Sequence, residues 1–340
     1  MISDLSHYIS GQRWGVLMGA FNANLIWIIS VTFAALSIGT TVRLIALRNT
    51  TADVIEKRIG SLKVWWILAL LWSAAVLLGP VGVAVLLAVA SILGMREYLR
   101  LIGSTEDIGR ITIIGLFVCG AIHYGLILAG SDDAAKWFLP IALLLLMGAI
   151  RATTCRTDEY IKITAGLVWG ALLMIYALSH SLFLFKIQTR LEPWVGNAGW
   201  FLFLVIITEM NDIMQAIVGR KIGRHKITPL VSPNKSVEGL LGGLGTSLVL
   251  SVLLAPFMTT ITLDRSFWGG VFLSSMAGLL ISMAGFLGDI NMSAIKRDAG
   301  VKDGSSLLPG MGGIIDRIDS LTFTGPAFYY FVVLLNPLSI

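Results

Sequence analysis

Stretches of apolar residues, each long enough to cross a lipid bilayer, recur along almost the whole of this 340-residue chain. A bilayer core is about 30 Å thick, and roughly 20 apolar residues in a helix span it. Only 13% of the residues are charged, compared with about 25% in a typical soluble domain. We therefore expect an all-α, polytopic integral membrane protein with about ten transmembrane helices. The expected spans are residues 20–42, 62–78, 79–95, 111–130, 137–150, 161–185, 198–219, 240–261, 267–288 and 321–338.

Some of these spans leave alternatives open. The span 137–150 is short, and only the turn at Gly79-Pro80 separates 62–78 from 79–95. Such an element could be re-entrant or tilted rather than a simple crossing. The first apolar stretch is too long for the core of a signal peptide, and no small-residue cleavage site follows it, so we expect a retained helix.

The distribution of basic residues predicts the orientation of the chain, because Lys and Arg in short loops mark the cytoplasmic side. With the N-terminus outside, alternating spans place most of the 25 Lys and Arg residues in inner loops. The exceptions are Arg13, Lys136, Lys186, Arg190 and Arg265. We therefore expect both termini to lie outside.

One membrane domain is the simplest interpretation, since the sequence shows no repeat of fixed period and no low-complexity segment. Residues 1–195 are expected to form scaffold helices, whereas residues 196–340 hold nearly every residue that needs a chemical explanation. We expect the second part to be the catalytic region. Cys119 falls within a span and Cys155 in an inner loop, and two isolated cysteines make neither a disulfide framework nor a zinc site.

Two acidic residues fall inside the span 198–219. Glu209 and Asp212 are three residues apart, so they share one helix face. An ionised Asp at the bilayer centre costs roughly 2.5–3.5 kcal/mol, which favours contact of Asp212 with a metal ion or a substrate. The alternative is that Asp212 lies near the inner interface and pairs with a loop arginine such as Arg220. For Glu209 the two interpretations are equally supported.

The next inner loop is rich in basic groups and hydroxyls. It contains Gly219-Arg220-Lys221-Ile222-Gly223-Arg224-His225-Lys226 and Ser232-Pro233-Asn234-Lys235-Ser236-Val237-Glu238-Gly239. These cations suit a polyanionic nucleotide, because guanidinium groups grip phosphate bidentately and lysine acts as a point charge. Basic inner loops also follow from the orientation rule or from anionic lipid headgroups, so the Ser-Pro-x-Lys-Ser-x-Glu-Gly order is the more specific signal.

The polar segment between Asp289 and Asp319 is the sharpest functional signal. Asp316 and Asp319 are about one helical turn apart, so both can point at one site, and Asp289 closes the inner end of the preceding span. Mg²⁺ generally binds through one or two carboxylates together with phosphate oxygens of a substrate. These carboxylates beside basic residues therefore suit one or two Mg²⁺ ions. A solvated salt-bridge network is the alternative.

This segment contains the run Ser293-x-Ile295-Lys296-Arg297-x4-Lys302-Asp303-x-Ser305-x2-Leu308-Pro309-x-Met311-Gly312-Gly313-Ile314-x-Asp316-Arg317-Ile318-Asp319. The order of these residues resembles the C-terminal signature of the phosphatidate cytidylyltransferase (CDP-diacylglycerol synthase) family. Upstream, Asp212, Gly219-Arg220, Gly223-Arg224-His225-Lys226, Pro229, Ser232-Pro233, Lys235-Ser236 and Glu238-Gly239 are also similar to that family. The resemblance covers about residues 208–325.

The resemblance implies conversion of CTP and phosphatidic acid, or a related lipid phosphate, to CDP-diacylglycerol and pyrophosphate in phospholipid biosynthesis. It implies Mg²⁺ on Asp289, Asp316 and Asp319, with Lys235 as a further catalytic residue. Substrate contacts are then expected from Ser232, Ser293, Lys296, Arg297, Lys302, Asp212 and Arg317. The expected location is a bacterial inner membrane with the active site facing the cytoplasm. The expected partners are these substrates and membrane lipids, with no nucleic acid, and a homodimer is left open.

The chain departs from the family pattern at two places. Met311 stands where the family has His, and Met can neither shuttle a proton nor donate a hydrogen bond. Gln215 and Ala216 stand where the family usually has a small residue and an aromatic one. These changes indicate a divergent member and leave open a change of lipid acceptor or nucleotide.

Two other functions remain open at this stage. A CTP-dependent lipid-alcohol kinase would release CDP and a lipid phosphate, whereas the transferase releases pyrophosphate and a CDP-lipid. A non-catalytic transporter or lipid- or nucleotide-binding paralogue is the alternative from another class, and it is favoured by Met311 and by the intramembrane Glu209 and Asp212. Nucleotide binding without turnover would distinguish it from both enzymes.

Overall fold

The computed structural model describes residues 23–47, 52–154, 159–187, 191–263, 265–305, 307–308 and 311–335. Its helices are α2 (Ala23–Ala46), α3 (Ala52–Leu77), α4 (Gly79–Ile102), α5 (Thr105–Ile108), α6 (Arg110–Leu128), α7 (Asp132–Ala142), α8 (Gly148–Thr154), α9 (Tyr160–Ala171), α10 (Leu178–Lys186), α11 (Ala198–Ile222), α12 (Val237–Met258), α13 (Phe267–Asp298), α14 (Ile315–Ile318) and α15 (Leu321–Leu335). Two π-helical segments, η1 (Leu143–Met147) and η2 (Leu172–Ala177), join α7 to α8 and α9 to α10.

Ten helical segments in the described part of the chain are long and apolar enough to cross a membrane. This confirms the all-α, polytopic prediction. The predicted span 137–150 belongs to a longer segment, Asp132–Thr154, and the span predicted to end at residue 95 continues to Ile102. Leu78 alone separates α3 from α4, and Pro80 stands in the first turn of α4, where proline costs no helical hydrogen bond.

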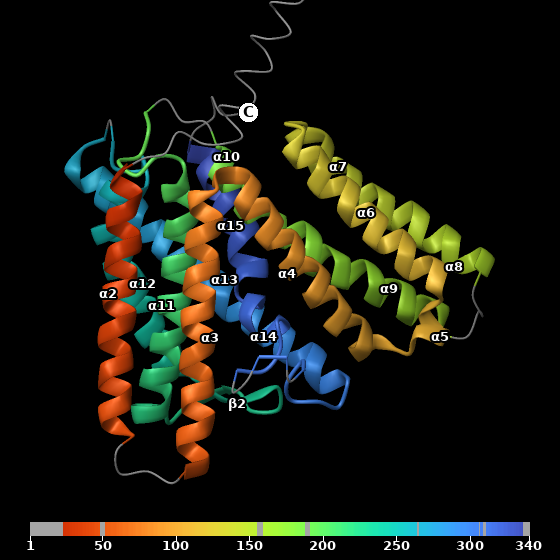
Figure 1. The fold of residues 1–340 in the computed structure, drawn as a ribbon, viewed down its shortest axis with the longest axis horizontal. Coiled ribbons are helices and arrows are strands. Elements are labelled where there is room, and N and C mark those ends of the chain that lie inside the picture. Colours follow the sequence, from red (N-terminus) through yellow and green to blue (C-terminus); the bar gives the residue numbers. More distant parts are fainter. Residues whose placement is uncertain are drawn as a thin grey trace, which may run out of the picture.

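Successive long helices run in opposite directions, so the C-terminal end of one helix and the N-terminal end of the next lie on the same side of the bundle (Figure 1). The C-terminal ends of α4, α11 and α13 and the N-terminal ends of α12 and α14 lie at the lower end in that view. These helix ends flank the basic loops that the sequence predicts on the inner side of the membrane. The predicted outward position of the termini concerns residues 1–22 and 336–340, which lie outside the described residues.

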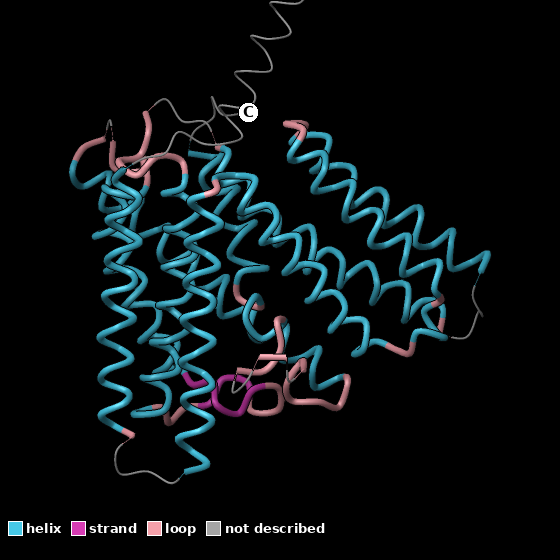
Figure 2. Tube along the Cα trace, viewed as in Figure 1, coloured by secondary structure: helices cyan, strands magenta, loops and turns pink. Residues whose placement is uncertain are grey.

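A small hairpin at the lower end adds to the predicted architecture (Figure 2). β1 (Lys226–Thr228) pairs antiparallel with β2 (Ser232–Ser236), with Lys226 opposite Ser236 and Thr228 opposite Ser232. Ser236 then caps α12, because its Oγ accepts a hydrogen bond from the Gly239 amide at 3.1 Å. Such a side-chain cap satisfies one of the free amides of a helix N-terminus.

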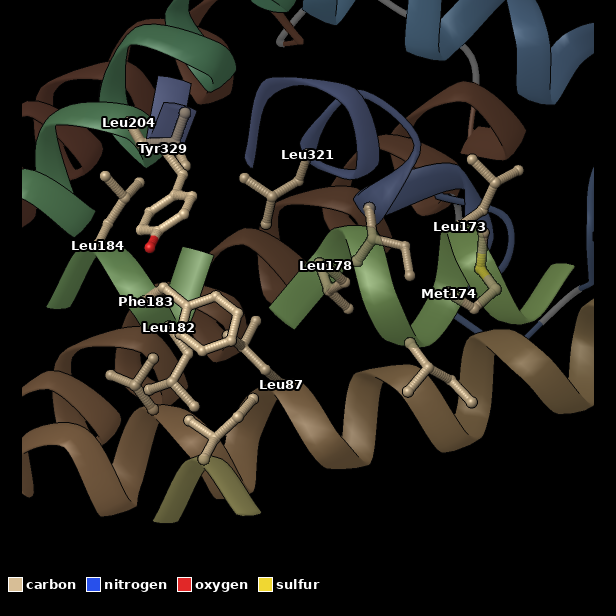
Figure 3. Packing of buried hydrophobic residues seen from close by; sticks show 14 of the residues in the cluster. Leu87, Leu173, Met174, Leu178, Leu182, Phe183, Leu184, Leu204, Leu321 and Tyr329 are labelled. Atoms are coloured by element: carbon tan, nitrogen blue, oxygen red, sulfur yellow. The ribbon is translucent and has the colours of Figure 1, made fainter. Parts of the chain in front are cut away.

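The apolar core lies where α4, α10, α11 and α15 meet. Figure 3 shows Leu87, Leu182, Phe183, Leu204 and Tyr329 packed together from these helices. Many large apolar side chains elsewhere are exposed, including Ile111, Ile114 and Val118 on one face of α6. A helix with apolar residues on its outer face suits hydrocarbon rather than water, so the chain is a multi-pass membrane protein.

Candidate active site

Four segments that are distant in the sequence meet at the lower end of the bundle. They are the inner half of α11, strand β2, the last turns of α13, and residues 311–320 around α14 (Figure 1). A two-residue turn at Asp319 and Ser320 joins α14 to α15. The predicted functional residues therefore share one end of the membrane bundle.

Three carboxylates converge at this meeting point. Asp319 interacts electrostatically with Asp289 of α13 and Asp212 of α11. Gly288 makes the approach possible, because a Cβ at this position would lie 2.6 Å from the main-chain oxygen of Asp319. Only glycine allows α13 to pass so close to this backbone, and the next residue along α13 is Asp289.

Lys235 and Ser293 lie on either side of Asp289. The ammonium group of Lys235 forms an ion pair with one carboxylate oxygen of Asp289, and it also donates to Gln215 Oε1 of α11 at 3.2 Å. Ser293 Oγ donates to the other oxygen of Asp289 at 3.3 Å. Strand β2, α11 and α13 therefore meet at one carboxylate.

A second ion pair is buried about two helical turns further along α13. Lys296 Nζ donates to Asp316 Oδ1 at 2.5 Å, and Lys296 is only 7% exposed. The other oxygen of Asp316 accepts the amides of Gly304 at 3.1 Å and Gly313 at 2.8 Å. Asp316 therefore joins α13 to both ends of the loop that precedes α14.

Asp212 faces the cluster rather than the loop arginine considered in the sequence. Its Oδ2 accepts a hydrogen bond from Ser320 Oγ at 2.6 Å, and its neighbour Asn211 accepts from Ser282 Oγ of α13 at 2.7 Å. Arg220 is exposed. These contacts tie α11 to α13 and to the start of α15.

Glu97 holds the site from the N-terminal half of the chain. It lies on α4 and is 4% exposed. Its carboxylate accepts the Ser305 hydroxyl at 2.5 Å, the Ile314 amide at 3.1 Å and the Ile315 amide at 3.0 Å. The last two amides open α14, where free N–H groups and the helix dipole favour a negative charge.

Other predicted residues lie at the edge of the site. Arg297 is exposed and donates to the main-chain oxygens of Val231 at 3.2 Å and Val301 at 3.1 Å, so it braces the hairpin against the loop. Lys302 is exposed, with no hydrogen bond or ion pair to the described residues. Ser232 opens β2 and is half-buried.

Three donors on the described segments that build the site have no hydrogen-bond partner. Within the described part of the chain, Gln215 Nε2, Asn291 Nδ2 and Arg317 Nε are buried without a hydrogen-bond partner. Arg317 also interacts electrostatically with Glu209 and Asp212. A buried donor without a partner costs about 1–3 kcal/mol, and phosphate oxygens would satisfy such donors.

The carboxylates offer the hard oxygen ligands that Mg²⁺ prefers. Among the residues that the structure describes, however, no group of three or more His, Cys, Asp or Glu side chains could hold a metal ion by itself. The chemistry of the donors suits Mg²⁺ only in the mode where substrate phosphates and water complete the coordination.

Sequence reasoning found most of this cluster but missed its supports. Glu97, Asn211, Ser320 and Gly288 were not assigned any role. The available signal for Glu97 was an acidic residue on the face of α4 that also carries the buried Gly94 and Tyr98. The predicted end of the span at residue 95 removed Glu97 from the helix and hid that signal.

Comparison with known proteins gives a family for this arrangement. The model of the cytidylyltransferase family matches residues 59–335, which extends well into the N-terminal half. An uncharacterized protein of Escherichia coli, YnbB, is 36% identical over 272 residues, which make up 80% of this chain and 86% of that protein.

Curated enzymes are similar over a shorter part. Phosphatidate cytidylyltransferase of Synechocystis is 47% identical over 126 residues, which cover 37% of this chain and 40% of the relative. Phosphatidate cytidylyltransferase of Haemophilus influenzae is 43% identical over 150 residues, which cover 43% of this chain and 51% of the relative. The match thus spans about half the length of these enzymes or less.

Proposed function

Because this chain belongs to the cytidylyltransferase family, we propose that it transfers the cytidylyl group of CTP to phosphatidic acid or a related lipid phosphate. The products are CDP-diacylglycerol, or the matching CDP-lipid, and pyrophosphate. The convergence of Asp212, Asp289 and Asp319 with the two ion-paired lysines carries the proposal. The names of the two relatives support phosphatidate as the acceptor.

The reaction joins two anions, and this sets the task of the side chains. An oxygen of the lipid phosphate attacks the α-phosphorus of CTP, and the bond from that phosphorus to the bridging oxygen of the β-phosphate breaks. Pyrophosphate leaves with those electrons. Catalysis of such transfers is mainly positioning and electrostatic stabilisation. We assign Lys235 and Lys296 to neutralise phosphate charge, with Arg317, Gln215 and Asn291 as donors.

We propose that Asp289 and Asp319, with Asp212 beside them, hold one or two Mg²⁺ ions together with phosphate oxygens. Such an ion would supply Lewis-acid stabilisation of the charge on the phosphoryl oxygens. The assignment of Asp316 as a metal ligand stays a prediction. Its oxygens already accept hydrogen bonds from Lys296, Gly304 and Gly313, which supports a second role in holding the loop.

Met311 is compatible with this chemistry. It is half-buried, and its amide donates to the Leu308 oxygen at 3.0 Å, so it serves the turn of the loop. A phosphomonoester is already largely ionised at neutral pH, since its second proton leaves near pH 6. The attacking lipid phosphate therefore needs little help from a general base. We place the reaction at the cytoplasmic face of a bacterial inner membrane, where the basic loops are expected.

The experiment is a product assay on the purified full-length protein in detergent. It is incubated with labelled CTP, Mg²⁺ and phosphatidic acid, and separately with other lipid phosphates and polyprenyl alcohols. The proposal predicts a labelled CDP-lipid and pyrophosphate. Formation of CDP and a phosphorylated alcohol would show that the protein is a CTP-dependent lipid-alcohol kinase instead. Binding of CTP without any product would show that it is a non-catalytic binding protein.

A matched pair of variants tests the site within this assay. Asp289→Asn keeps the size of the side chain but loses the charge that pairs with Lys235, so activity should fall to background while expression stays normal. Asp303→Asn removes a carboxylate that is exposed on the neighbouring loop, and it should retain activity. Equal activity of the two variants would refute the assignment.

A further inference from the structure

A groove on the exposed side of the C-terminal end of α4 lies beside the site loop. It has a volume of about 440 Å³ and is lined by Leu93, Arg96, Glu97, Arg100, Ser305 and Leu307. Glu97 forms its floor, and the hydroxyl of Ser305 is already engaged by Glu97. The groove therefore shares one wall with the loop whose other contacts fix Asp316.

Two arginines give this groove its charge. Arg96 and Arg100 are one helical turn apart on α4, so their side chains lie on one face. Both are exposed, and neither forms a hydrogen bond or an ion pair with the described residues. Guanidinium groups bind phosphate through paired N–H donors, and the only carboxylate in the groove, that of Glu97, is occupied by Ser305 and two main-chain amides.

The same face of α4 carries an apolar stripe that leads to the arginines. Val85, Val89 and Ile92 are exposed on it, at the four- and three-residue spacings of one helix face. Leu307, which is 53% exposed, adds an apolar side chain at the rim of the groove. An acyl chain could lie along the stripe while its headgroup reaches the arginines, which sit in the last two turns of α4 at the end where the site lies.

We propose that this groove docks the lipid phosphate acceptor, with Arg96 and Arg100 holding its phosphomonoester and the stripe on α4 holding its acyl chains. The inference rests on the proposed function and adds the place where the acceptor enters. It assigns substrate binding to the N-terminal half, which the sequence treated as scaffold. The ligand of this groove is a membrane lipid with a terminal phosphate, rather than free phosphate or nucleotide.

The kinetic test uses mixed micelles in which the surface fraction of phosphatidic acid and the concentration of CTP are varied separately. The Arg96→Gln/Arg100→Gln double variant should raise the apparent KM for phosphatidic acid about tenfold or more, as expected for lost charge-assisted hydrogen bonds. The KM for CTP and kcat should stay within about twofold of wild type. Arg96→Lys/Arg100→Lys should recover part of the loss, because it keeps the charge.

Arg110→Gln is the matched control. Arg110 is also exposed at the same end of the bundle, in the first turn of α6, but it lies outside the groove. If Arg110→Gln raises the KM for phosphatidic acid as strongly, the effect belongs to the whole basic surface and the groove proposal is wrong. An unchanged KM in the Arg96→Gln/Arg100→Gln variant, or an equal rise in the KM for CTP, also overturns it.

A binding test separates this proposal from the proposed function, because it needs no turnover. Short-chain phosphatidic acid should raise the Tm of the Asp289→Asn protein by mass action, and adding Arg96→Gln/Arg100→Gln should remove the shift. Inorganic phosphate or a short-chain phosphodiester lipid that gives the same shift would overturn the commitment to a lipid phosphomonoester. If the wild-type protein makes no CDP-lipid but the Tm shift still depends on the two arginines, the proposed activity is wrong and the proposed lipid site is retained.

Discussion

At the scale of single residues, Glu97 is the side chain on which the site geometry depends most. One buried carboxylate satisfies the two amides that open α14 and also the Ser305 hydroxyl. Gly313 fits beneath it, because a Cβ there would lie 2.9 Å from Glu97 Cδ. The carboxylate and the glycine together fix the start of α14, the helix that carries Asp316 and ends just before Asp319.

Glu97→Gln should therefore weaken both folding and catalysis. The amide nitrogen of glutamine cannot accept a hydrogen bond, so at least one buried donor loses its partner, at a cost of about 1–3 kcal/mol. We expect a lower Tm in detergent and a kcat reduced by about tenfold or more. Thermal unfolding and the CTP assay measure the two effects.

The control for this variant is Asp133→Asn on α7. Asp133 pairs with Lys136, but its side chain is 89% exposed, and exposed pairs contribute about 0–1 kcal/mol. Its Tm and kcat should stay close to wild type. A normal kcat in Glu97→Gln would show that the start of α14 does not depend on this carboxylate.

The buried pair of Lys296 and Asp316 allows the two roles of Asp316 to be separated. Lys296→Met leaves a buried carboxylate without its cation, which typically costs about 3–5 kcal/mol. If Asp316 is also a metal ligand, Asp316→Asn should raise the Mg²⁺ concentration needed for half-maximal activity, whereas Lys296→Met should lower kcat without that change. Equal Mg²⁺ dependence in both variants would leave Asp316 with the anchoring role alone.

Lys186→Met provides a matched comparison for this pair. Lys186 forms a partly buried ion pair with Asp132, far from the site and at the opposite end of the bundle. It should reduce the Tm but not kcat. A loss of kcat there would mean that the effect of Lys296→Met reflects general destabilisation.

At the scale of elements, the β1–β2 hairpin is a feature that the sequence pattern around it did not predict. The sequence predicted a basic loop between α11 and α12, and the order of Ser236 and Glu238 indicated a specific structure there. The pairing of β1 with β2 could not be predicted, because it depends on Glu238 reaching back to accept the amides of Arg224 at 3.0 Å and His225 at 3.2 Å. By contrast, apolar length alone was enough to predict the spans.

Glu238→Gln should loosen the hairpin and so displace Lys235 from Asp289. The charged acceptor of these two amides is lost, and a neutral amide oxygen accepts hydrogen bonds less strongly than a carboxylate does. We expect the KM for CTP to rise several-fold with a small change in Tm. His225→Ala removes only an exposed side-chain contact of Glu238 and should change the KM much less; an equal effect of the two would contradict the role given to the main-chain contacts.

At the scale of the whole molecule, both halves of the chain contribute residues to the candidate site, whereas the sequence predicted scaffold helices over residues 1–195 and a catalytic region over residues 196–340. The acidic cluster is built from α11, α13 and residues 316–320, and Glu97 of α4 holds the loop beside it. Asp212, Asp289 and Asp319 come from separate helices, so their meeting depends on tertiary packing such as the contact at Gly288. Spacing along the chain predicts which face a residue occupies, and it does not predict which faces meet.

The basic residues at the lower end of the bundle predict that this end faces the cytoplasm. The hairpin tip and the loop between α12 and α13 lie at opposite ends of α12, so the membrane must separate them. In a chain lacking Cys119 and Cys155, we introduce either Leu230→Cys, where the side chain is 93% exposed, or Arg265→Cys, which is exposed as well.

A membrane-impermeant maleimide added to intact spheroplasts should label Arg265→Cys at once and Leu230→Cys only after the membrane is disrupted. The reason is that the basic residues around the hairpin retain that end in the cytoplasm, where CTP is supplied. Labelling in the reverse order would place the acidic cluster on the side without nucleotide. The proposed reaction would then have no donor, whatever the geometry of the site.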